Sequence, residues 1–298
     1  MSFPPLLGFS SASLGAQVRR LAVSFSLLAG VFALAPSAQA AEPVSSVRLY
    51  ALDCGRVHFN DGGIFSDTGE YDGKPLDLAA PCFVIRHPKG TLLWDTGLGD
   101  ALAKNKDGVD NNGIHLAVPV TLASQLERIG LAPADINVVG FSHFHFDHTG
   151  NAALFTGATW LINKAELDFA LSEPTPFGVS TEAIAGYKNV KVQNVEGDYD
   201  VFGDGSVRLL KAPGHTPGHA VLMLRLAKSG VVILSGDLAH THANYDQRRV
   251  PAFNFNRADS LASLDRVHAI AKRLKARVVI QHDPKDFAAL PHFPAYLQ

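Results

Sequence analysis

The chain has 298 residues, of which 47% are hydrophobic and 18% are charged, and its formal net charge at pH 7 is −2. This length fits one large domain and leaves little room for a second. Lysines and arginines form no basic cluster, which argues against a nucleic-acid partner because phosphate binding needs a basic stripe. We therefore expect a small-molecule substrate.

The first 40 residues have the layout of a secretory signal peptide. Arg19 and Arg20 precede an apolar run from 21 to 35, and the triplet Ala38-Gln39-Ala40 is a small-x-small cleavage site. The run is shorter than the ~20 apolar residues that a membrane-spanning helix needs. We expect cleavage after Ala40, a catalytic domain at residues 41–298, no stable membrane anchor after cleavage, and a periplasmic or secreted location.

Cys54 and Cys82 are the only cysteines of the chain. In an oxidising compartment an even pair can form a disulfide. Both lie in segments that resemble strands, and neighbouring strands would bring them into range. Two separate buried thiols are an equally good interpretation, so the sequence leaves the bridge open.

Apolar runs separated by Gly, Pro, Asn and Asp predict an alternation of strands and helices. The predicted strands span 44–52, 82–87, 91–94, 137–141, 158–162, 190–194, 207–212, 220–226, 231–234 and 277–281. The predicted helices span 120–129, 164–172 and 257–276, the last with Asn256 as its N-cap. Segments 98–116, 173–186 and 240–256 are predicted to be loops that shape a substrate entrance.

This order of elements predicts an α/β fold, an αββα sandwich of two mixed β-sheets flanked by helices. The polar motifs of the chain follow predicted strands, so their side chains can converge on one edge of the sandwich. Loops that a rigid scaffold holds in place are a common location for active sites.

The most informative segment is the H-x-H-x-D-H motif at residues 143–148. A packed core has no use for so many polar groups together, and the alternative is a polar loop with incidental histidines. In the extended chain after a strand, His143 and His145 share one face because side chains alternate. A helix that begins near Thr149 would turn Asp147 and His148 toward a second point. This arrangement suits two metal ions side by side.

Together with motifs elsewhere in the chain, this segment resembles the metallo-β-lactamase superfamily. The matching segments are Trp94-Asp95-Thr96-Gly97, the H-x-H-x-D-H motif, Pro213-Gly214-His215-Thr216-Pro217-Gly218-His219, Ser235-Gly236-Asp237 and Gln281-His282-Asp283. Within the superfamily the similarity is greatest to the acyl-homoserine lactonases, through segments 49–55 and 282–287. The resemblance covers nearly all of residues 41–298.

The resemblance implies a site for two divalent metal ions, for which we expect zinc. One metal would have three imidazole ligands, His143, His145 and His215. The other would be bound by Asp147, His148 and His282, and Asp237 would bridge the two metals.

The resemblance also implies a reaction, in which a metal-bridging hydroxide attacks the carbonyl of a lactone or ester. Asp147 would carry a proton to the leaving alkoxide. The lactonases carry a tyrosine three residues after the bridging aspartate, where this chain has His240. We therefore predict His240 as the donor to the developing oxyanion, and Tyr245 as the second candidate. Asp95 is expected to orient a ligand and His219 to be structural.

The sequence leaves several other activities open on the same fold. A β-lactamase is disfavoured by Asp237 as a bridging carboxylate. A thioester hydrolase such as glyoxalase II would share the ligands but has a helical substrate-binding region, and only sixteen residues follow His282 here. An iron-dependent oxidoreductase, such as a persulfide dioxygenase, is the alternative from another enzyme class. The oligomeric state is not indicated.

Overall fold

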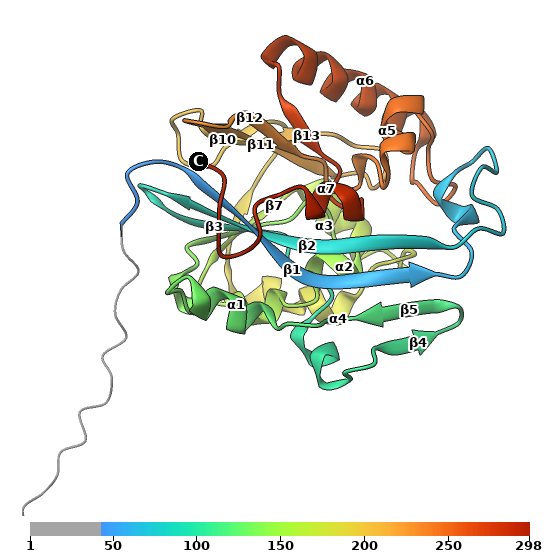
Figure 1. The fold of residues 1–298 in the computed structure, drawn as a ribbon, viewed down its shortest axis with the longest axis horizontal. Helices are drawn as coiled ribbons and strands as arrows, with labels where there is room; N and C mark the ends of the chain where they lie inside the picture. Colours follow the sequence, from blue (N-terminus) through green and yellow to red (C-terminus); the bar gives the residue numbers. More distant parts are fainter. Residues whose placement is uncertain (1–42) are drawn as a thin grey trace, which may run out of the picture. The chain divides into compact units, whose positions relative to one another are not determined.

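Two β-sheets form the centre of the fold in the computed structural model, which describes residues 43–298. The signal peptide predicted at residues 1–40 lies outside this part. The larger sheet has eight strands in the order β4-β5-β1-β2-β3-β6-β7-β8 (Figure 1). In chain order these strands are β1 (Arg48–Phe59), β2 (Leu76–His87), β3 (Gly90–Trp94), β4 (Val109–Asn111), β5 (Ile114–Ala117), β6 (Val138–Gly140), β7 (Thr159–Ile162) and β8 (Lys191–Asn194).

The smaller sheet has five strands in the order β13-β12-β11-β10-β9. They are β9 (Tyr199–Asp200), β10 (Val207–Lys211), β11 (Ala220–Leu226), β12 (Gly230–Leu234) and β13 (Arg277–Val279). Both sheets are mixed, because β3, β6, β7 and β8 run parallel in the first, and β12 and β13 run parallel in the second.

Helices cover the outer faces of both sheets. The α-helices of residues 43–298 are α1 (Leu122–Arg128), α2 (Phe146–Thr149), α3 (Lys164–Ala170), α4 (Thr181–Ile184), α5 (His242–Gln247), α6 (Arg257–Leu274) and α7 (Pro284–Ala288). Residues of α1, α3 and α4 pack on the larger sheet, and residues of α6 pack on the smaller one. Between the sheets, Phe83 and Trp94 pack against Leu222 and Leu234. The predicted αββα sandwich is therefore confirmed.

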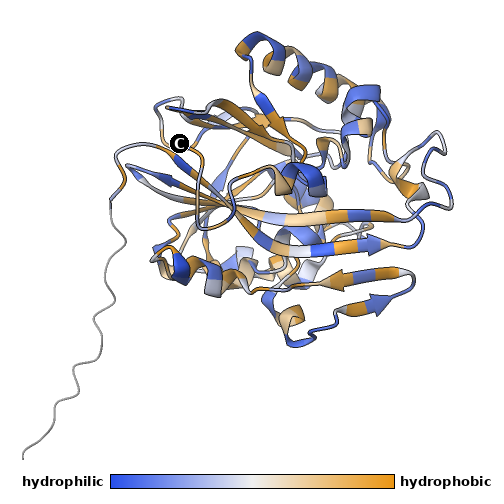
Figure 2. Cartoon of the chain, in the orientation of Figure 1, coloured by the Kyte–Doolittle hydropathy of each residue, from blue (hydrophilic) through white to orange (hydrophobic). Residues whose placement is uncertain are grey.

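Helix α6 follows its sequence pattern closely. Leu264, Val267 and Ala271 are buried against the smaller sheet, and Figure 2 shows polar and apolar residues interleaved along the helix. The predicted N-cap is also confirmed, because Asn256 Oδ1 accepts hydrogen bonds from the backbone N–H groups of Ala258 (2.9 Å) and Asp259 (3.1 Å).

The predicted loops contain more regular structure than expected. Segment 98–116 includes a 3₁₀ helix (Asp100–Lys104) and most of the β4–β5 hairpin, which extends the larger sheet beside β1. Segments 173–186 and 240–256 contain α4 and α5. These elements are short and half-buried or exposed over much of their length, so their sequences lack the long apolar periodicity on which the prediction relied.

The structure also resolves the question of the two cysteines. Cys54 of β1 and Cys82 of β2 form a disulfide, which joins neighbouring strands of the larger sheet. Within residues 43–298, no helix is long and apolar enough to cross a membrane.

The Asn256 cap gives a direct test of the α6 boundary. We expect Asn256→Ala to lower the free energy of unfolding by about 1 kcal/mol, because two backbone N–H groups lose their acceptor. Asn256→Asp keeps an acceptor oxygen and should stay within a few tenths of a kcal/mol of the unchanged protein. Urea unfolding followed by circular dichroism measures both values. Equal midpoints for the two variants would contradict the capping role.

Candidate metal centre

Four separate loops bring the predicted ligands to one edge of the sandwich. The H-x-H-x-D-H segment follows β6, and His215 lies in the connection between β10 and β11. Asp237 follows β12 and His282 follows β13, and these two strands are parallel neighbours. Because parallel strands end at the same edge of a sheet, the loops that follow them meet there.

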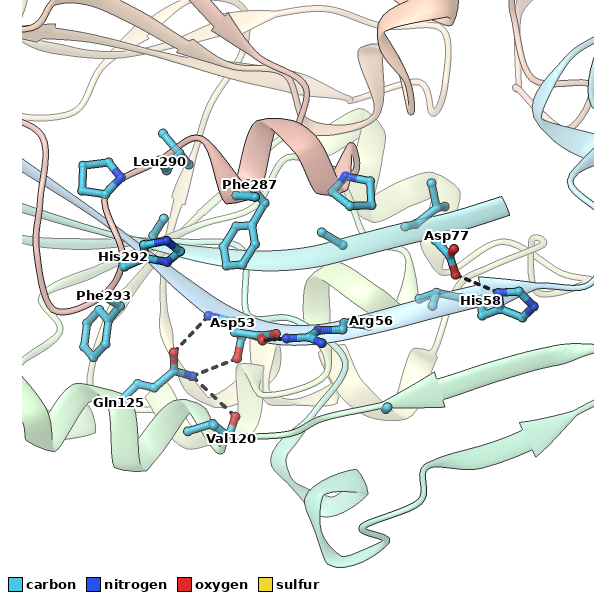
Figure 3. A pocket seen from close by; sticks show the side chains of 18 of the residues that line it. Asp53, Arg56, His58, Asp77, Val120, Gln125, Phe287, Leu290, His292 and Phe293 are labelled. Atoms are coloured by element: carbon cyan, nitrogen blue, oxygen red, sulfur yellow. Dashed lines mark hydrogen bonds and ion pairs between the residues drawn. The ribbon is translucent and has the colours of Figure 1, made fainter. Parts of the chain in front are cut away.

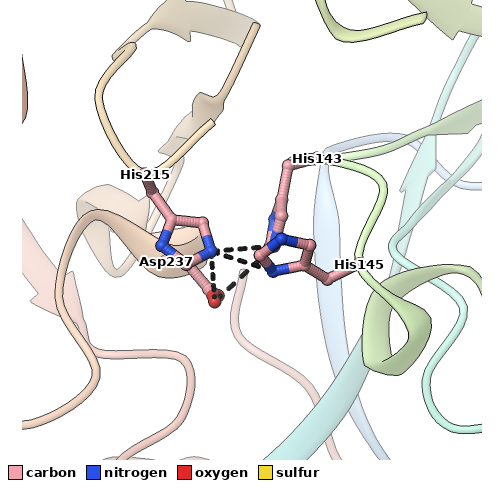
Figure 4. Close-up of side chains that lie close together, drawn as sticks. All are labelled: His143, His145, His215 and Asp237. Atoms are coloured by element: carbon pink, nitrogen blue, oxygen red, sulfur yellow. Dashed lines mark hydrogen bonds and ion pairs between the residues drawn. The ribbon is translucent and has the colours of Figure 1, made fainter. Parts of the chain in front are cut away.

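Three histidines and one carboxylate oxygen form the first group (Figure 4). His215 Nε2 lies 3.2 Å from His143 Nε2, 3.1 Å from His145 Nδ1 and 3.1 Å from Asp237 Oδ2. All four side chains are buried. The three imidazoles predicted to share one metal therefore do point at a common position.

The second group meets the other oxygen of the same carboxylate. Asp237 Oδ1 lies 2.8 Å from His282 Nε2 and 3.1 Å from His148 Nε2, and these two nitrogens are 3.1 Å apart. Asp147 Oδ2 lies 3.7 Å from His282 Nε2 and 3.8 Å from His148 Nε2. Asp237 thus contacts both groups, one with each oxygen, which is the position predicted for a bridging ligand.

The chemistry of these donors fits divalent metal ions. A neutral imidazole carries a proton on only one nitrogen. The outer nitrogens of His148 and His282 face oxygen acceptors, Asp95 Oδ2 and the carbonyl oxygen of Ala79, so in the neutral rings the two Nε2 atoms present lone pairs to one another. Buried lone pairs that face one another are unfavourable unless a cation lies between them. Imidazole nitrogens with carboxylate oxygens are a donor set that zinc accepts.

The electrostatics of the two groups differ. Burial, assisted by the neighbouring imidazoles, lowers the pKa of His143 and His145 well below the ordinary value. Burial would raise the pKa of Asp237, but the imidazoles around it lower that pKa well below its usual range. Burial also opposes charge on His148 and His282, yet the Asp237 carboxylate raises the pKa of both. Protons on these two rings would compete with a metal ion.

Asp95 holds the second group in place, as expected from its position after β3. Its Oδ2 accepts hydrogen bonds from His148 Nδ1 (2.9 Å) and Gln281 Nε2 (2.6 Å), and its Oδ1 accepts from the backbone N–H of Ser142 (2.7 Å). The Asp95 carboxylate therefore fixes the orientation of the His148 ring. Through Gln281 it also connects the larger sheet with the smaller one.

His219 has the structural role that was predicted. Its Nδ1 donates to the carbonyl oxygen of Ala212 (2.8 Å), which leaves Nε2 free to accept from the backbone N–H of Asp237 (2.9 Å). Burial lowers the pKa of His219 to about 3, so the ring stays neutral. In this way His219 positions the backbone of Asp237, which contacts both groups of ligands.

Glu166 is a buried residue of the site that the sequence analysis missed. Its Oε1 accepts from the backbone N–H of Phe144 (2.9 Å), and its Oε2 accepts from Thr216 Oγ1 (2.7 Å) and the backbone N–H of Gly218 (3.0 Å). Glu166 therefore connects the loop of His143 and His145 with the loop of His215. An acidic residue in the first turn of a helix is usually exposed. The position of Glu166 in the sequence therefore did not indicate that it connects two ligand loops.

His240 lies against the bridging carboxylate. Its Nε2 is 3.0 Å from Asp237 Oδ2, and its ring stacks on that of His282 with a centroid distance of 5.4 Å. Burial lowers the pKa of His240 to about 4, so the ring is neutral and has one N–H to give. The tautomer that satisfies Asp237 carries the proton on Nε2. Donation to an oxyanion, as predicted, would require release of this hydrogen bond.

Tyr245, the second candidate for the donor to the oxyanion, does not line the cavity beside the two groups. Thr241 caps α5, and the helix turns the Tyr245 ring onto His268 of α6, with a centroid distance of 3.9 Å. The ring belongs to the apolar cluster between α6 and the smaller sheet. Tyr245 was chosen because it lies close to His240 in sequence, and that choice did not consider that α5 turns the side chain away from His240.

A small cavity of about 60 Å³ opens beside the two groups. Its wall includes His145, Asp147, Asp237 and His240 together with an aromatic set, Phe59, Phe65, Phe146, Phe177 and Phe253. Each of the three predicted entrance segments contributes to it, through Ile114, Phe177 and Phe253, which agrees with the expectation. Phe255, two residues after Phe253, does not line this cavity; it is 58% exposed and packs on Phe169.

A larger cavity of about 760 Å³ lies elsewhere, between β1, β2, α1 and α7 (Figure 3). Most of its lining residues are apolar, among them Phe287 and Leu290. Asp53 pairs with Arg56 (2.7 Å) and His58 with Asp77 (2.7 Å) along its wall. None of the seven predicted metal ligands lines this cavity, so its size does not make it the reaction site.

Comparisons with known proteins agree with this geometry. A family model described as the metallo-beta-lactamase superfamily matches residues 76–282. The N-acyl homoserine lactonase AttM of Azorhizobium caulinodans is 29% identical over 264 residues, which cover 85% of this chain and 99% of that protein. The lactonase AiiA of Bacillus thuringiensis subsp. kurstaki is 29% identical over 257 residues, which cover 84% and 98%.

Solved structures show the same similarity. An N-acyl homoserine lactone hydrolase, with the product N-hexanoyl-L-homoserine at its catalytic metal center, matches with a TM-score of 0.74 and 28% identity. That match covers 85% of this chain and 100% of the other. The dizinc lactonase AidC matches with a TM-score of 0.61 and 18% identity over 86% of this chain and 92% of its own, a likeness of fold alone.

Because Glu166 connects two ligand loops, its substitution should lower the free energy of unfolding measurably. In Glu166→Gln, an amide N–H₂ would face a backbone N–H, and a buried donor would lose its acceptor. We expect the free energy of unfolding to fall by about 1–3 kcal/mol. Glu182→Gln, at an exposed position of α4, is the matched control and should change little. Urea unfolding compares the two variants, and equal stabilities would show that Glu166 does not connect the loops.

Proposed function

Because the chain belongs to the metallo-β-lactamase superfamily, we propose that it is a metal-dependent hydrolase that opens the lactone ring of N-acyl homoserine lactones. The observation that carries the proposal is the position of Asp237, whose two oxygens contact two separate groups of buried imidazoles. This arrangement matches a two-metal hydrolytic site. The lactonases AttM and AiiA support the substrate class, since each aligns along almost its whole length.

The proposed cofactors are two divalent metal ions, with zinc as the candidate. One would be held by His143, His145 and His215, the other by Asp147, His148 and His282, and both by Asp237. Bound there, such ions supply a water of lowered pKa near ~7 and polarise a carbonyl oxygen.

Asp147 is the residue best placed to move a proton. Its side chain is 13% exposed, more than the other predicted ligands, and it lines the small cavity. A carboxylate at the border of a metal group and a substrate cavity can take a proton from the nucleophile. It can then deliver that proton to the alkoxide that leaves when the ring opens.

The aromatic walls of the cavity suit an acyl chain. Phe65 and Phe253 contact one another edge to face with centroids 5.5 Å apart, and Phe177 approaches Phe253 at 5.4 Å. Apolar burial contributes roughly 0.8 kcal/mol per methylene group. His240, next to Asp237, takes the place of the tyrosine in the lactonases, and we propose that it orients the bridging carboxylate during the reaction.

The substrate proposal is tested by incubating zinc-loaded protein with N-acyl homoserine lactones of several chain lengths. We expect ring opening, detected by release of a proton or by mass spectrometry. Asp237→Ala should abolish turnover and lower the metal content, because both groups lose a shared ligand. Asp110→Ala, at an exposed position far from the cluster in sequence, is the control. Cleavage of β-lactams or thioesters, or sulfur-dependent oxygen uptake, without lactone opening would refute the proposal.

We also propose that the protein is exported and processed. The signal-like pattern before Ala41 and the Cys54–Cys82 disulfide support this, since disulfides persist in oxidising compartments. Intact-mass measurement of protein from a periplasmic fraction should give a chain that starts at Ala41 and has no thiol available for labelling before reduction. A chain that retains Met1 and stays in the cytoplasmic fraction, with free thiols, would contradict export.

A further inference from the structure

Metal-binding histidines are usually held by a hydrogen bond from the ring nitrogen that does not bind the metal. Four of the five histidines that are predicted to bind metal follow this rule. His143 Nδ1 contacts Ser142 Oγ (3.0 Å), and His148 Nδ1 contacts Asp95 Oδ2 (2.9 Å). The remaining two contacts are His215 Nδ1 with Asn254 Oδ1 (2.9 Å) and His282 Nδ1 with the carbonyl oxygen of Ala79 (2.5 Å).

His145 is the exception. It faces the cluster through Nδ1, which lies 3.1 Å from His215 Nε2, so its Nε2 is the outward nitrogen. Across residues 43–298 this Nε2 has no hydrogen-bond partner. The residue is 7% exposed and lines the small cavity. No other described residue fixes this nitrogen by a hydrogen bond, so the contacts that the protein supplies to orient the ring are packing contacts.

The backbone of Gly178 lies directly against the His145 ring. A Cβ atom on Gly178 would be 2.8 Å from Cδ2 of His145, and 3.0 Å from its Cγ and Nε2. Real Cβ atoms essentially never come as close as 2.8 Å, so any other residue here would force the imidazole or the Gly178 backbone to shift. Gly178 also has a φ of +77°, which favours glycine.

The segment that carries Gly178 is anchored to the metal-binding loop. The carbonyl oxygen of Gly178 accepts a hydrogen bond from the backbone N–H of Phe146 (2.8 Å), and His145 pairs with Val179 in an isolated β-bridge. The backbone N–H of Val179 in turn donates to the carbonyl oxygen of Pro176 (3.2 Å). These contacts hold the Gly178 backbone at a fixed distance from the ring.

We propose that Gly178 is a positioning residue, which holds the His145 imidazole for metal binding through direct backbone contact in place of a hydrogen bond. The neighbouring Phe177 lines the substrate cavity, so the same segment borders both the substrate and a metal ligand. The inference rests on the metal binding proposed above, but it does not depend on which substrate is hydrolysed.

The test is the zinc affinity of Gly178→Ala, measured by competition with a chelator and by metal content per chain. Displacement of a ring through the contacts around it should weaken zinc binding at one of the two positions by roughly 10- to 100-fold. The absorption spectrum of the Co²⁺-loaded variant should change as well, because it reports ligand geometry. Neither readout depends on turnover.

Gly205→Ala is the matched control. Gly205 has the same φ of +77°, but an added Cβ would meet no atom within 4 Å. It therefore carries the backbone strain of the substitution without the contact with His145. Equal zinc affinities and Co²⁺ spectra for the two variants would overturn the proposal, even if both are less stable than the unchanged protein.

A second variant covers the case in which Gly178→Ala does not fold. Pro176→Gly loosens the segment and adds no atom near the ring. We expect it to weaken zinc binding in the same direction but by less, with the Co²⁺ spectrum broadened. Unchanged affinity in this variant would refute the role of the segment. Failure of the unchanged protein to bind any metal would refute the proposed function instead.

Discussion

One buried carboxylate among five imidazoles is the constraint on which this structure depends. Asp237 is almost fully buried, and its charge has no compensation from arginine or lysine among the residues described. Burial of an isolated charge is strongly unfavourable. The surrounding imidazole rings, and the cations that the site binds, therefore have to compensate the negative charge of Asp237. The backbone of Asp237 is itself fixed by His219, which shows that this position is determined before any substrate arrives.

The sandwich makes this concentration of polar groups possible because its two sheets supply different parts of the site. The larger sheet contributes the H-x-H-x-D-H loop and Asp95, and the smaller sheet contributes Asp237 and His282. Polar contacts cross between them at the same edge, including Gln281 Nε2 to Asp95 and the backbone N–H of Ala220 to the carbonyl oxygen of Ser142 (2.9 Å). The apolar core below is continuous, so the ligand loops rest on a rigid base.

The sequence predicted the parts of this molecule that depend on strong local patterns. Ten of the thirteen strands of residues 43–298, α6 with its Asn256 cap, and the convergence of the seven candidate ligands followed from periodicity and from motifs after strands. The short strands β4, β5 and β9 were not predicted. The sequence also failed where the decisive fact is a contact between distant segments. Glu166 has the sequence context of a surface acid, and only the fold places it between two ligand loops. Tyr245 was assigned by its distance in sequence from His240, but the pitch of α5 directs it to the opposite side.

The shared carboxylate also links the two halves of the centre thermodynamically. A cation bound by one group of ligands reduces the negative charge of Asp237 that is available to a cation in the other group. The same cation also fixes the position of the Asp237 carboxylate. Occupancy is therefore not a sum of two independent equilibria, and the order of filling affects the second step. Since ions that bind only the folded chain add stability by mass action, scarcity of metal would remove catalysis and weaken the fold together.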